Sequence, residues 1–306
     1  MSNRILKANI LEVSSEHTHI VRRFEKKKLG RFVKKLDYIK KLAKQLVFSE
    51  KPVVSKSHTE IERSIYIILR HLPRERFATE RHTNKRPVWF SYEQTHSRLI
   101  DTIKSNSAYF NVTLIILYDG TEEELRDDFV YNYHYPNSLK IEFQLINGRS
   151  ALKAGLIMLD FIKNMEINNE DLLYLLENDY MHRDNWLSAI SEIYNSSIDF
   201  DFITLFDHLG AYNLPRNYNY KSKLYATDSV IWKTTPATCF SFIATKKIFN
   251  ECYDTFLTEL LDYKIWTKLL KKKKMVMLAP IPAYATHCMI DELSPGIDWT
   301  AESGVA

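Results

Sequence analysis

Short apolar runs alternate with amphipathic stretches along most of the chain, and this alternation predicts an α/β fold. Three runs are rich in aliphatic and β-branched side chains, which is typical of strands: residues 111–118 (NVTLIILY), 140–146 (KIEFQLI) and 172–176 (LLYLL). The stretches beside them carry apolar side chains at helical spacing: residues 92–105, 122–129 and 151–164. Strands that alternate with helices predict βαβ units and a largely parallel sheet that is covered on both faces.

Weaker signals on both sides of this region extend the expected sheet. Further strands are expected at residues 76–81, 202–206 and 275–279. Residues 229–249 have the pattern of a strand, a turn and a second strand. A helix is expected after residue 184, with Asp184 or Asn185 as its cap.

The first 72 residues have a different pattern, which predicts a helical N-terminal extension. Apolar residues recur every three or four positions between residues 29 and 46, and a second such stretch, from residue 61 to 72, ends at Pro73. We therefore expect two domains, an extension over residues 1–72 and an α/β domain over residues 73–306.

The charge of the chain is concentrated in the extension. The net charge is +4, yet residues 22–44 alone carry eleven Lys or Arg against two acidic side chains. A cationic amphipathic helix over residues 22–48 can pack on the main domain with its charged face in water, or it can contact an anionic membrane surface. Nucleic acid is not expected as a partner, because nothing downstream has the pattern of a base-reading module.

The cysteines and the N-terminal residues predict a cytoplasmic protein. It would be peripheral at the membrane if the basic helix binds lipid. The three cysteines are far apart and form no CxxC motif, which argues against a disulfide framework and favours a reducing compartment. The N-terminus has no signal-peptide pattern, and no apolar run approaches the roughly 20 residues of a membrane span.

Polar residues with chemical potential follow three of the predicted strands. Asp119-Gly120 follows the first, Asn147-Gly148-Arg149 the second and Glu177-Asn178-Asp179 the third. Ligands of parallel sheets bind at the carboxyl ends of the strands. A carboxylate there can accept hydrogen bonds from a nucleoside, an arginine can pair with phosphate, and two carboxylates can hold a divalent cation. Each motif taken alone is also compatible with an ordinary turn or helix cap.

The order of these motifs resembles that of the GT-A glycosyltransferases. The matching segments are DG, NGRSALKAG and LLYLLENDY, and the resemblance covers residues 75–299. It implies a Rossmann-like, mixed and largely parallel twisted sheet flanked by helices, with a nucleotide-sugar-binding half over residues 73–180 and an acceptor and catalytic half over residues 181–306. The family's acidic triplet is usually DxD, whereas this chain has END with Glu177 in the first position.

The resemblance also implies roles for particular residues of the first half. The contacts to the nucleotide sugar are expected from Thr83, Arg86, Asp119, Asn147, Arg149, Glu177, Asn178 and Asp179. The triplet is expected to bind Mn²⁺ or Mg²⁺, with Asp179 as a direct ligand and Glu177 as a second ligand or a contact to ribose or metal-bound water. A late histidine, here His287, completes the metal site in several relatives of this kind.

The second half is expected to supply the general base and the acceptor contacts. In inverting members of the resembled family an acidic residue near the start of a late helix takes the proton of the acceptor hydroxyl. Asp262 occupies this place, where it can equally be a helix cap, and Glu259 is the alternate base. Trp232 and Thr238 are expected near the acceptor.

The functional hypothesis is a metal-dependent transferase that moves a sugar from a nucleotide-diphosphate sugar to a hydroxyl of a glycan or glycolipid, with inversion. Two alternatives stay open. One is a nucleotidyltransferase acting on sugar phosphates, which is disfavoured because no Gly-rich phosphate loop follows the first predicted strand. The other is a non-catalytic binding module on a degenerate transferase fold.

Overall fold

The computed structural model describes the chain at residues 46–48, 63–72, 85–105, 108–148, 151–207, 209–213, 220–259 and 262–304. The chain divides into two compact units, residues 1–45 and 46–306, and the description concerns the second unit. Three sequence predictions therefore lie outside the described residues: the strand at residues 76–81, the site residues Thr83 and Arg149, and the basic helix up to residue 45.

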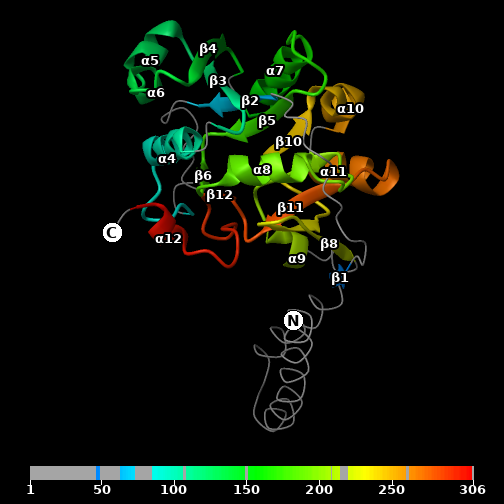
Figure 1. The fold of residues 1–306 in the computed structure, drawn as a ribbon. Coiled ribbons are helices and arrows are strands. Elements are labelled where there is room, and N and C mark those ends of the chain that lie inside the picture. Colours follow the sequence, from blue (N-terminus) through cyan, green and yellow to red (C-terminus); the bar gives the residue numbers. More distant parts are fainter. Residues whose placement is uncertain are drawn as a thin grey trace, which may run out of the picture. The chain divides into compact units, whose positions relative to one another are not determined.

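The second unit is built on one mixed sheet of ten strands (Figure 1). Four neighbouring strands are parallel: β4 (Lys140–Ile146), β3 (Asn111–Asp119), β2 (Ser64–His71) and β5 (Leu172–Glu177). The sheet continues beyond β5 in the order β10 (Phe242–Thr245), β7 (Phe202–Ile203), β11 (Met277–Ile281), β9 (Ile231–Thr234), β8 (Ser222–Ala226) and β1 (Leu46–Phe48). β10 is antiparallel to both β5 and β7, so β7 has the direction of the parallel strands. This arrangement confirms the predicted mixed, largely parallel α/β fold.

The prediction of a helix at residues 61–72 is wrong, because residues 64–71 form the strand β2 at the centre of the parallel sheet. β2 pairs with β3 on one side and with β5 on the other. Its side chains Ile65, Ile67 and Ile68 are fully buried. A strand buried on both faces is a continuous apolar run, which periodicity alone does not distinguish from a buried helix. The α/β unit therefore begins before residue 73, and residues 46–48 are likewise a strand and not part of a helix.

Helices cover both faces of the sheet and enclose two apolar cores (Figure 1). The first core contains side chains of α4 (Tyr92–Lys104) and α8 (Trp186–Tyr194), and the second contains side chains of α7 (Ala151–Lys163), α10 (Lys246–Glu259) and α11 (Asp262–Trp266). α11 continues into a π-helical turn, Thr267–Lys272. Short helices complete the unit: α5 (Glu122–Asp127), α6 (Phe129–Asn132), α9 (Gly210–Asn213) and α12 (Trp299–Glu302). No helix of the described segments is long and apolar enough to cross a membrane.

The helix predictions at residues 92–105 and 151–164 are confirmed, and the one at residues 122–129 divides into α5 and α6. Asp128 separates the two helices: its backbone is extended, and its side chain accepts a hydrogen bond from the Val130 backbone N–H, so it caps α6. Asn185 precedes α8 as expected, but it is left-handed and its side chain makes no capping hydrogen bond.

A second, two-stranded sheet lies beside the carboxyl end of β5. β6 (Tyr180–His182) begins directly after the END triplet and pairs antiparallel with β12 (Ala285–His287). The register places His287 opposite Tyr180. This pairing brings the late segment of the chain to the triplet.

Candidate functional site

The carboxyl ends of β3 and β4 are joined by the first two polar motifs. Asp119 is buried, and its Oδ1 accepts a hydrogen bond from the Gly148 backbone N–H at 2.8 Å. A Cβ atom at position 148 would lie 2.7 Å from the backbone of Ala154, so only glycine lets α7 approach this loop. Asn147 beside it is exposed. Asp119 and Asn147 thus lie at the expected edge, with Asp119 tied to the neighbouring strand end.

Asn178, the middle residue of the triplet, is anchored to the protein. Its Nδ2 donates to the carbonyl of Leu72 at 3.3 Å and lies 3.4 Å from His71 Nδ1. Thr95 of α4 donates to the Asn178 carbonyl at 2.8 Å. These contacts hold the turn after β5 against the end of β2. The predicted contact of Asn178 to the nucleotide stays a prediction.

Asp179 and His287 contact each other, as the resemblance led us to expect. His287 Nε2 lies 3.0 Å from Asp179 Oδ2, and its Nδ1 lies 2.6 Å from Glu292 Oε2. Arg86 donates from Nη2 to the same Asp179 oxygen at 2.7 Å and from Nη1 to the Cys288 carbonyl at 2.9 Å. Residues from three distant segments therefore meet at the start of β6.

The charges of this cluster stabilise one another. Burial opposes the charge of His287, but Asp179 and Glu292 outweigh it and raise the pKa of His287 to about 9. Burial likewise disfavours the Asp179 carboxylate, yet His287 and Arg86 hold its pKa well below the usual range. The carboxylates of Asp179 and Glu292 are thus balanced by the positive charges of Arg86 and His287 in a mostly buried space.

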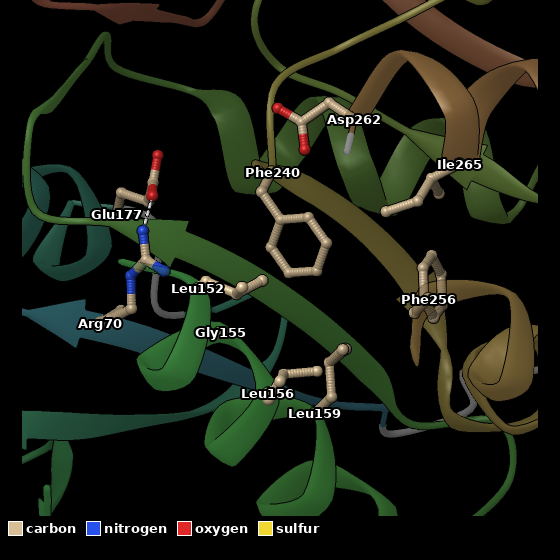
Figure 2. A pocket seen from close by; sticks show the side chains of 10 residues that line it. All are labelled: Arg70, Leu152, Gly155, Leu156, Leu159, Glu177, Phe240, Phe256, Asp262 and Ile265. Atoms are coloured by element: carbon tan, nitrogen blue, oxygen red, sulfur yellow. Dashed lines mark hydrogen bonds and ion pairs between the residues drawn. The ribbon is translucent and has the colours of Figure 1, made fainter. Parts of the chain in front are cut away.

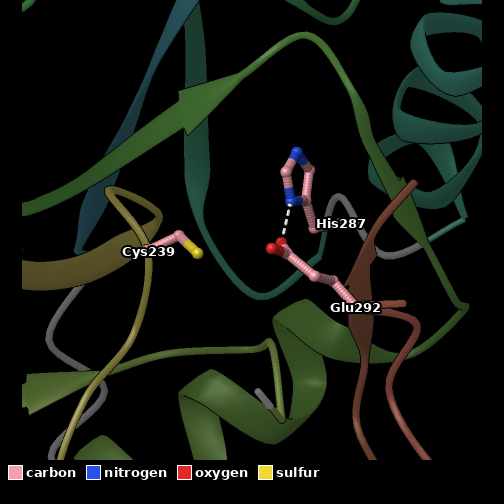
Figure 3. Close-up of side chains that lie close together, drawn as sticks. All are labelled: Cys239, His287 and Glu292. Carbon is pink, nitrogen blue, oxygen red and sulfur yellow. Dashed lines mark hydrogen bonds and ion pairs between the residues drawn. The ribbon is translucent and has the colours of Figure 1, made fainter. Parts of the chain in front are cut away.

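Several atoms of the cluster could hold a metal ion. Asp179 Oδ1 is buried and has no hydrogen-bond partner among the described residues, which is an unfavourable state that a bound cation would relieve. Cys239, His287 and Glu292 each offer a ligand atom, and these atoms lie within 4.8 Å of one another (Figure 3). Carboxylate oxygens and a neutral imidazole nitrogen suit Mn²⁺, so a bound cation would replace a proton of His287. The thiol, once deprotonated, would add a softer ligand. The residues present therefore fit a divalent cation.

Glu177 has a different environment from Asp179, although only one residue separates them. It forms an ion pair with Arg70, its partner on the neighbouring strand β2. No described contact joins Glu177 to His287, so the structure does not bring it into the cluster as the expected second metal ligand. Arg70 itself was missed by the sequence analysis, because its strand was taken for a helix. The available signal was a lone arginine at the end of the apolar run SIYIIL.

Asp262 lies on a cavity of about 370 Å³ together with Arg70 and Glu177 (Figure 2). Burial raises the pKa of Asp262 to about 6, with Arg70 opposing this shift and Glu292 adding to it. The alternate base, Glu259, ends α10 and pairs with Lys268 at 3.1 Å. The two acids therefore have different environments. Asp262 lines a cavity beside the ends of β2 and β5, whereas Glu259 is engaged in an ion pair.

The acceptor roles expected for Trp232 and Thr238 are not supported. Trp232 is fully buried in the first core and donates to Thr227 Oγ1. Thr238 is 3 % exposed and lies 2.9 Å from the hydroxyl of Thr204. Both side chains are needed for packing and internal hydrogen bonding, so neither can face an acceptor.

The comparisons with known proteins concern the fold. No protein-family model matches the chain, and a search of curated proteins finds no match. Among solved structures, the chain is similar to a 4-diphosphocytidyl-2C-methyl-D-erythritol synthase from Anaerococcus prevotii, with a TM-score of 0.40 and 9 % identity over 80 % of this chain and 97 % of that chain. The strand order defines a mixed, largely parallel α/β fold, and the polar motifs lie at the carboxyl ends of its parallel strands.

Proposed function

We propose that the chain is a metal-dependent glycosyltransferase that transfers a sugar from a nucleotide-diphosphate sugar to an acceptor hydroxyl of a glycan or glycolipid. The observation that carries this proposal is the contact between Asp179 and His287 at the carboxyl end of β5. A carboxylate from the triplet and a late histidine are the two groups that the resembled family brings together for its metal. The contact depends on the β6–β12 pairing, which places His287 opposite Tyr180.

The donor would bind along the carboxyl ends of the parallel strands. Asp179 and His287 would hold the cation, Mn²⁺ or Mg²⁺; Cys239 and Glu292 form a separate group of possible ligands with His287. A cation bound there supplies Lewis-acid neutralisation of the diphosphate leaving group. Arg86 would pair with phosphate oxygens in addition to Asp179, because a guanidinium has more donors than one carboxylate oxygen uses. Asp119 and Asn147 are the remaining candidates for nucleoside contacts.

Asp262 would act as the general base. The acceptor hydroxyl attacks the anomeric carbon, its proton passes to the Asp262 carboxylate, and the bond between that carbon and the diphosphate oxygen breaks. Attack opposite to the leaving group inverts the configuration. A carboxylate whose pKa is raised to about 6 by burial is ionised at neutral pH and is a stronger base than an exposed aspartate.

A nucleotidyltransferase acting on sugar phosphates is the second candidate, since its reaction uses the same kind of sheet edge. The similar synthase is of this class, but a likeness at a TM-score of 0.40 supports neither reaction over the other. Of the four neighbouring parallel strands, β2 comes first in the sequence, and the segment that follows it, residues 72–91, contains no glycine. The absence of a Gly-rich phosphate loop in the sequence therefore still favours the glycosyltransferase.

The testing experiment is a thermal-shift screen of nucleoside diphosphates, nucleotide sugars and nucleoside triphosphates, each with and without Mn²⁺. A ligand that binds only the native state raises its melting temperature. We expect a metal-dependent shift with one diphosphate and its sugar conjugates. Asp179→Asn should abolish this shift, whereas the matched variant Asp184→Asn, at an exposed carboxylate on the loop before α8, should keep it.

Two outcomes would contradict the proposal. A metal-dependent shift with triphosphates alone would favour the nucleotidyltransferase. The lack of a shift with any nucleotide would favour a non-catalytic module.

A further inference from the structure

The cavity beside Asp262 is polar at one side and apolar elsewhere. Its polar lining consists of Arg70, Glu177 and Asp262, at the ends of β2 and β5 and the start of α11. The other side chains are apolar: Leu152, Leu156 and Leu159 of α7, with Phe240, Phe256 and Ile265. Figure 2 shows Glu177 and Asp262 on one side of the space and Leu156 and Leu159 on the opposite side. A ligand in this cavity therefore meets two chemically different surfaces.

The apolar wall reaches from the surface to the core. Leu159, Phe256 and Ile265 are buried, whereas Leu152 is 51 % exposed at the surface of α7. The cavity is open to solvent, so its apolar side chains are in contact with water. An apolar ligand group would remove these side chains, Leu152 included, from water.

The polar groups of the cavity leave one carboxylate for the ligand. Arg70 and Glu177 pair with each other across β2 and β5. Asp262 is the base in the proposed function and faces the same space. A hydroxyl that gives its proton to Asp262 must therefore belong to a molecule whose adjoining part lies against the leucines of α7.

We propose that the acceptor is an alkyl-bearing glycolipid, whose hydroxyl contacts Asp262 and whose apolar chain occupies the cavity between α7, α10 and α11. This inference rests on the proposed function and decides between its two acceptor classes. A polymeric glycan would place hydroxyl groups against Leu152, Leu156 and Phe240, which offer no hydrogen bonds, and burying such groups without partners is costly. An alkyl chain meets no such penalty.

The test measures binding of methyl, butyl, hexyl and octyl β-D-glucopyranosides to the full chain by isothermal titration calorimetry, below micelle-forming concentrations and without donor or metal. Each added methylene group should strengthen binding about two- to fourfold until the cavity is filled. Leu152→Ser and Leu156→Ser should weaken octyl glucoside binding at least threefold while methyl glucoside binding stays unchanged. Leu145→Ser is the control, because Leu145 of β4 is 38 % exposed and lies outside the cavity. Its affinity should depend on alkyl chain length as that of the wild type does.

Binding that does not depend on chain length would overturn the inference, and so would an unchanged series in both cavity variants. Because Leu152 is half exposed, its variant should fold even if Leu156→Ser does not. The proposed function is tested separately by metal-dependent nucleotide binding. A flat alkyl series together with such nucleotide binding would remove the glycolipid and leave the glycosyltransferase. Binding that strengthens with alkyl length in the absence of nucleotide binding would support the alkyl site and contradict the glycosyltransferase.

Discussion

His287 Nε2 lies 3.0 Å from Asp179 Oδ2, although 108 positions separate the two residues. The contact exists because β12 pairs with β6, and β6 starts one residue after Asp179. The Tyr180 ring stacks on the imidazole of His287, with centroids 5.1 Å apart, and the Glu292 carboxylate contacts Nδ1 of the same imidazole. The histidine is thus oriented from three sides, as a metal ligand requires.

Removing this histidine should weaken the metal dependence of nucleotide binding. In His287→Ala the cation loses a nitrogen ligand, and Asp179 remains paired with Arg86. We expect the Mn²⁺ concentration that gives half of the nucleotide-induced thermal shift to rise at least tenfold. His134→Ala, at an exposed position, is the control and should behave as wild type. An unchanged Mn²⁺ requirement would show that His287 is not a metal ligand.

Replacing the proposed base should separate binding from transfer. Asp262→Asn keeps the shape of the side chain but cannot accept the proton of the acceptor hydroxyl. We expect the transfer rate to fall about 100-fold or more, with nucleotide affinity within twofold of wild type. Glu259→Gln should lose little activity, because Glu259 pairs with Lys268 outside the cavity. Normal transfer by Asp262→Asn would rule this residue out as the base.

The Asp262→Asn variant should be more stable than wild type at neutral pH. The pKa of Asp262 is raised from 3.8 to about 6, so the native state binds its proton more tightly than the unfolded state does. The free energy of unfolding therefore falls as pH rises from about 4 to about 6, and the loss persists at higher pH. After a discount for partial exposure, Asp262→Asn should raise this free energy by about 1–2 kcal/mol at pH 7, measured by urea unfolding. No gain at pH 7 would contradict the raised pKa.

The transfer rate of the wild type should depend on pH through the same group. Protonated Asp262 cannot act as a base, so activity should rise as pH increases through about 6 and level off above it. The charged groups that set this value are Arg70 of β2, which opposes the shift, and Glu292, which adds to it. Arg70→Met should move the inflection to higher pH. A rate that is flat between about pH 5 and about pH 7, one unit either side of the expected inflection, would contradict this assignment.

Position 148 should tolerate only glycine. A Cβ atom there would lie 2.7 Å from the Ala154 backbone, so Gly148→Ala should lower the free energy of unfolding by about 1–3 kcal/mol. Gly155→Ala is the matched control on α7, because its Cβ would meet Arg70 Nη1 at an ordinary 3.5 Å and alanine favours helix. Equal stability of the two variants, measured by urea unfolding, would show that the loop can move away from α7.

Local pattern determined much of the sheet. β3, β4 and β5 match their predicted ranges to within one residue, because each is an apolar run that polar or turn-forming residues interrupt. Since parallel strands end at a common edge, the same pattern also placed Asp119, Asn147 and the END triplet together. The meeting of Asp179 with His287 followed from the resemblance to the GT-A glycosyltransferases, and no local feature indicated it.

Tertiary structure decided what local pattern leaves ambiguous. Residues 65–69 form a continuous apolar run of a kind that a buried helix can also have, and pairing with β3 and β5 makes the segment a strand. Burial, which the sequence does not record, removed Trp232 from the surface and raised the pKa of Asp262. Tertiary contacts also give Glu177 and Asp179 different partners. Glu177 ends β5 and pairs with Arg70, whereas Asp179 lies in the following turn and contacts Arg86 and His287.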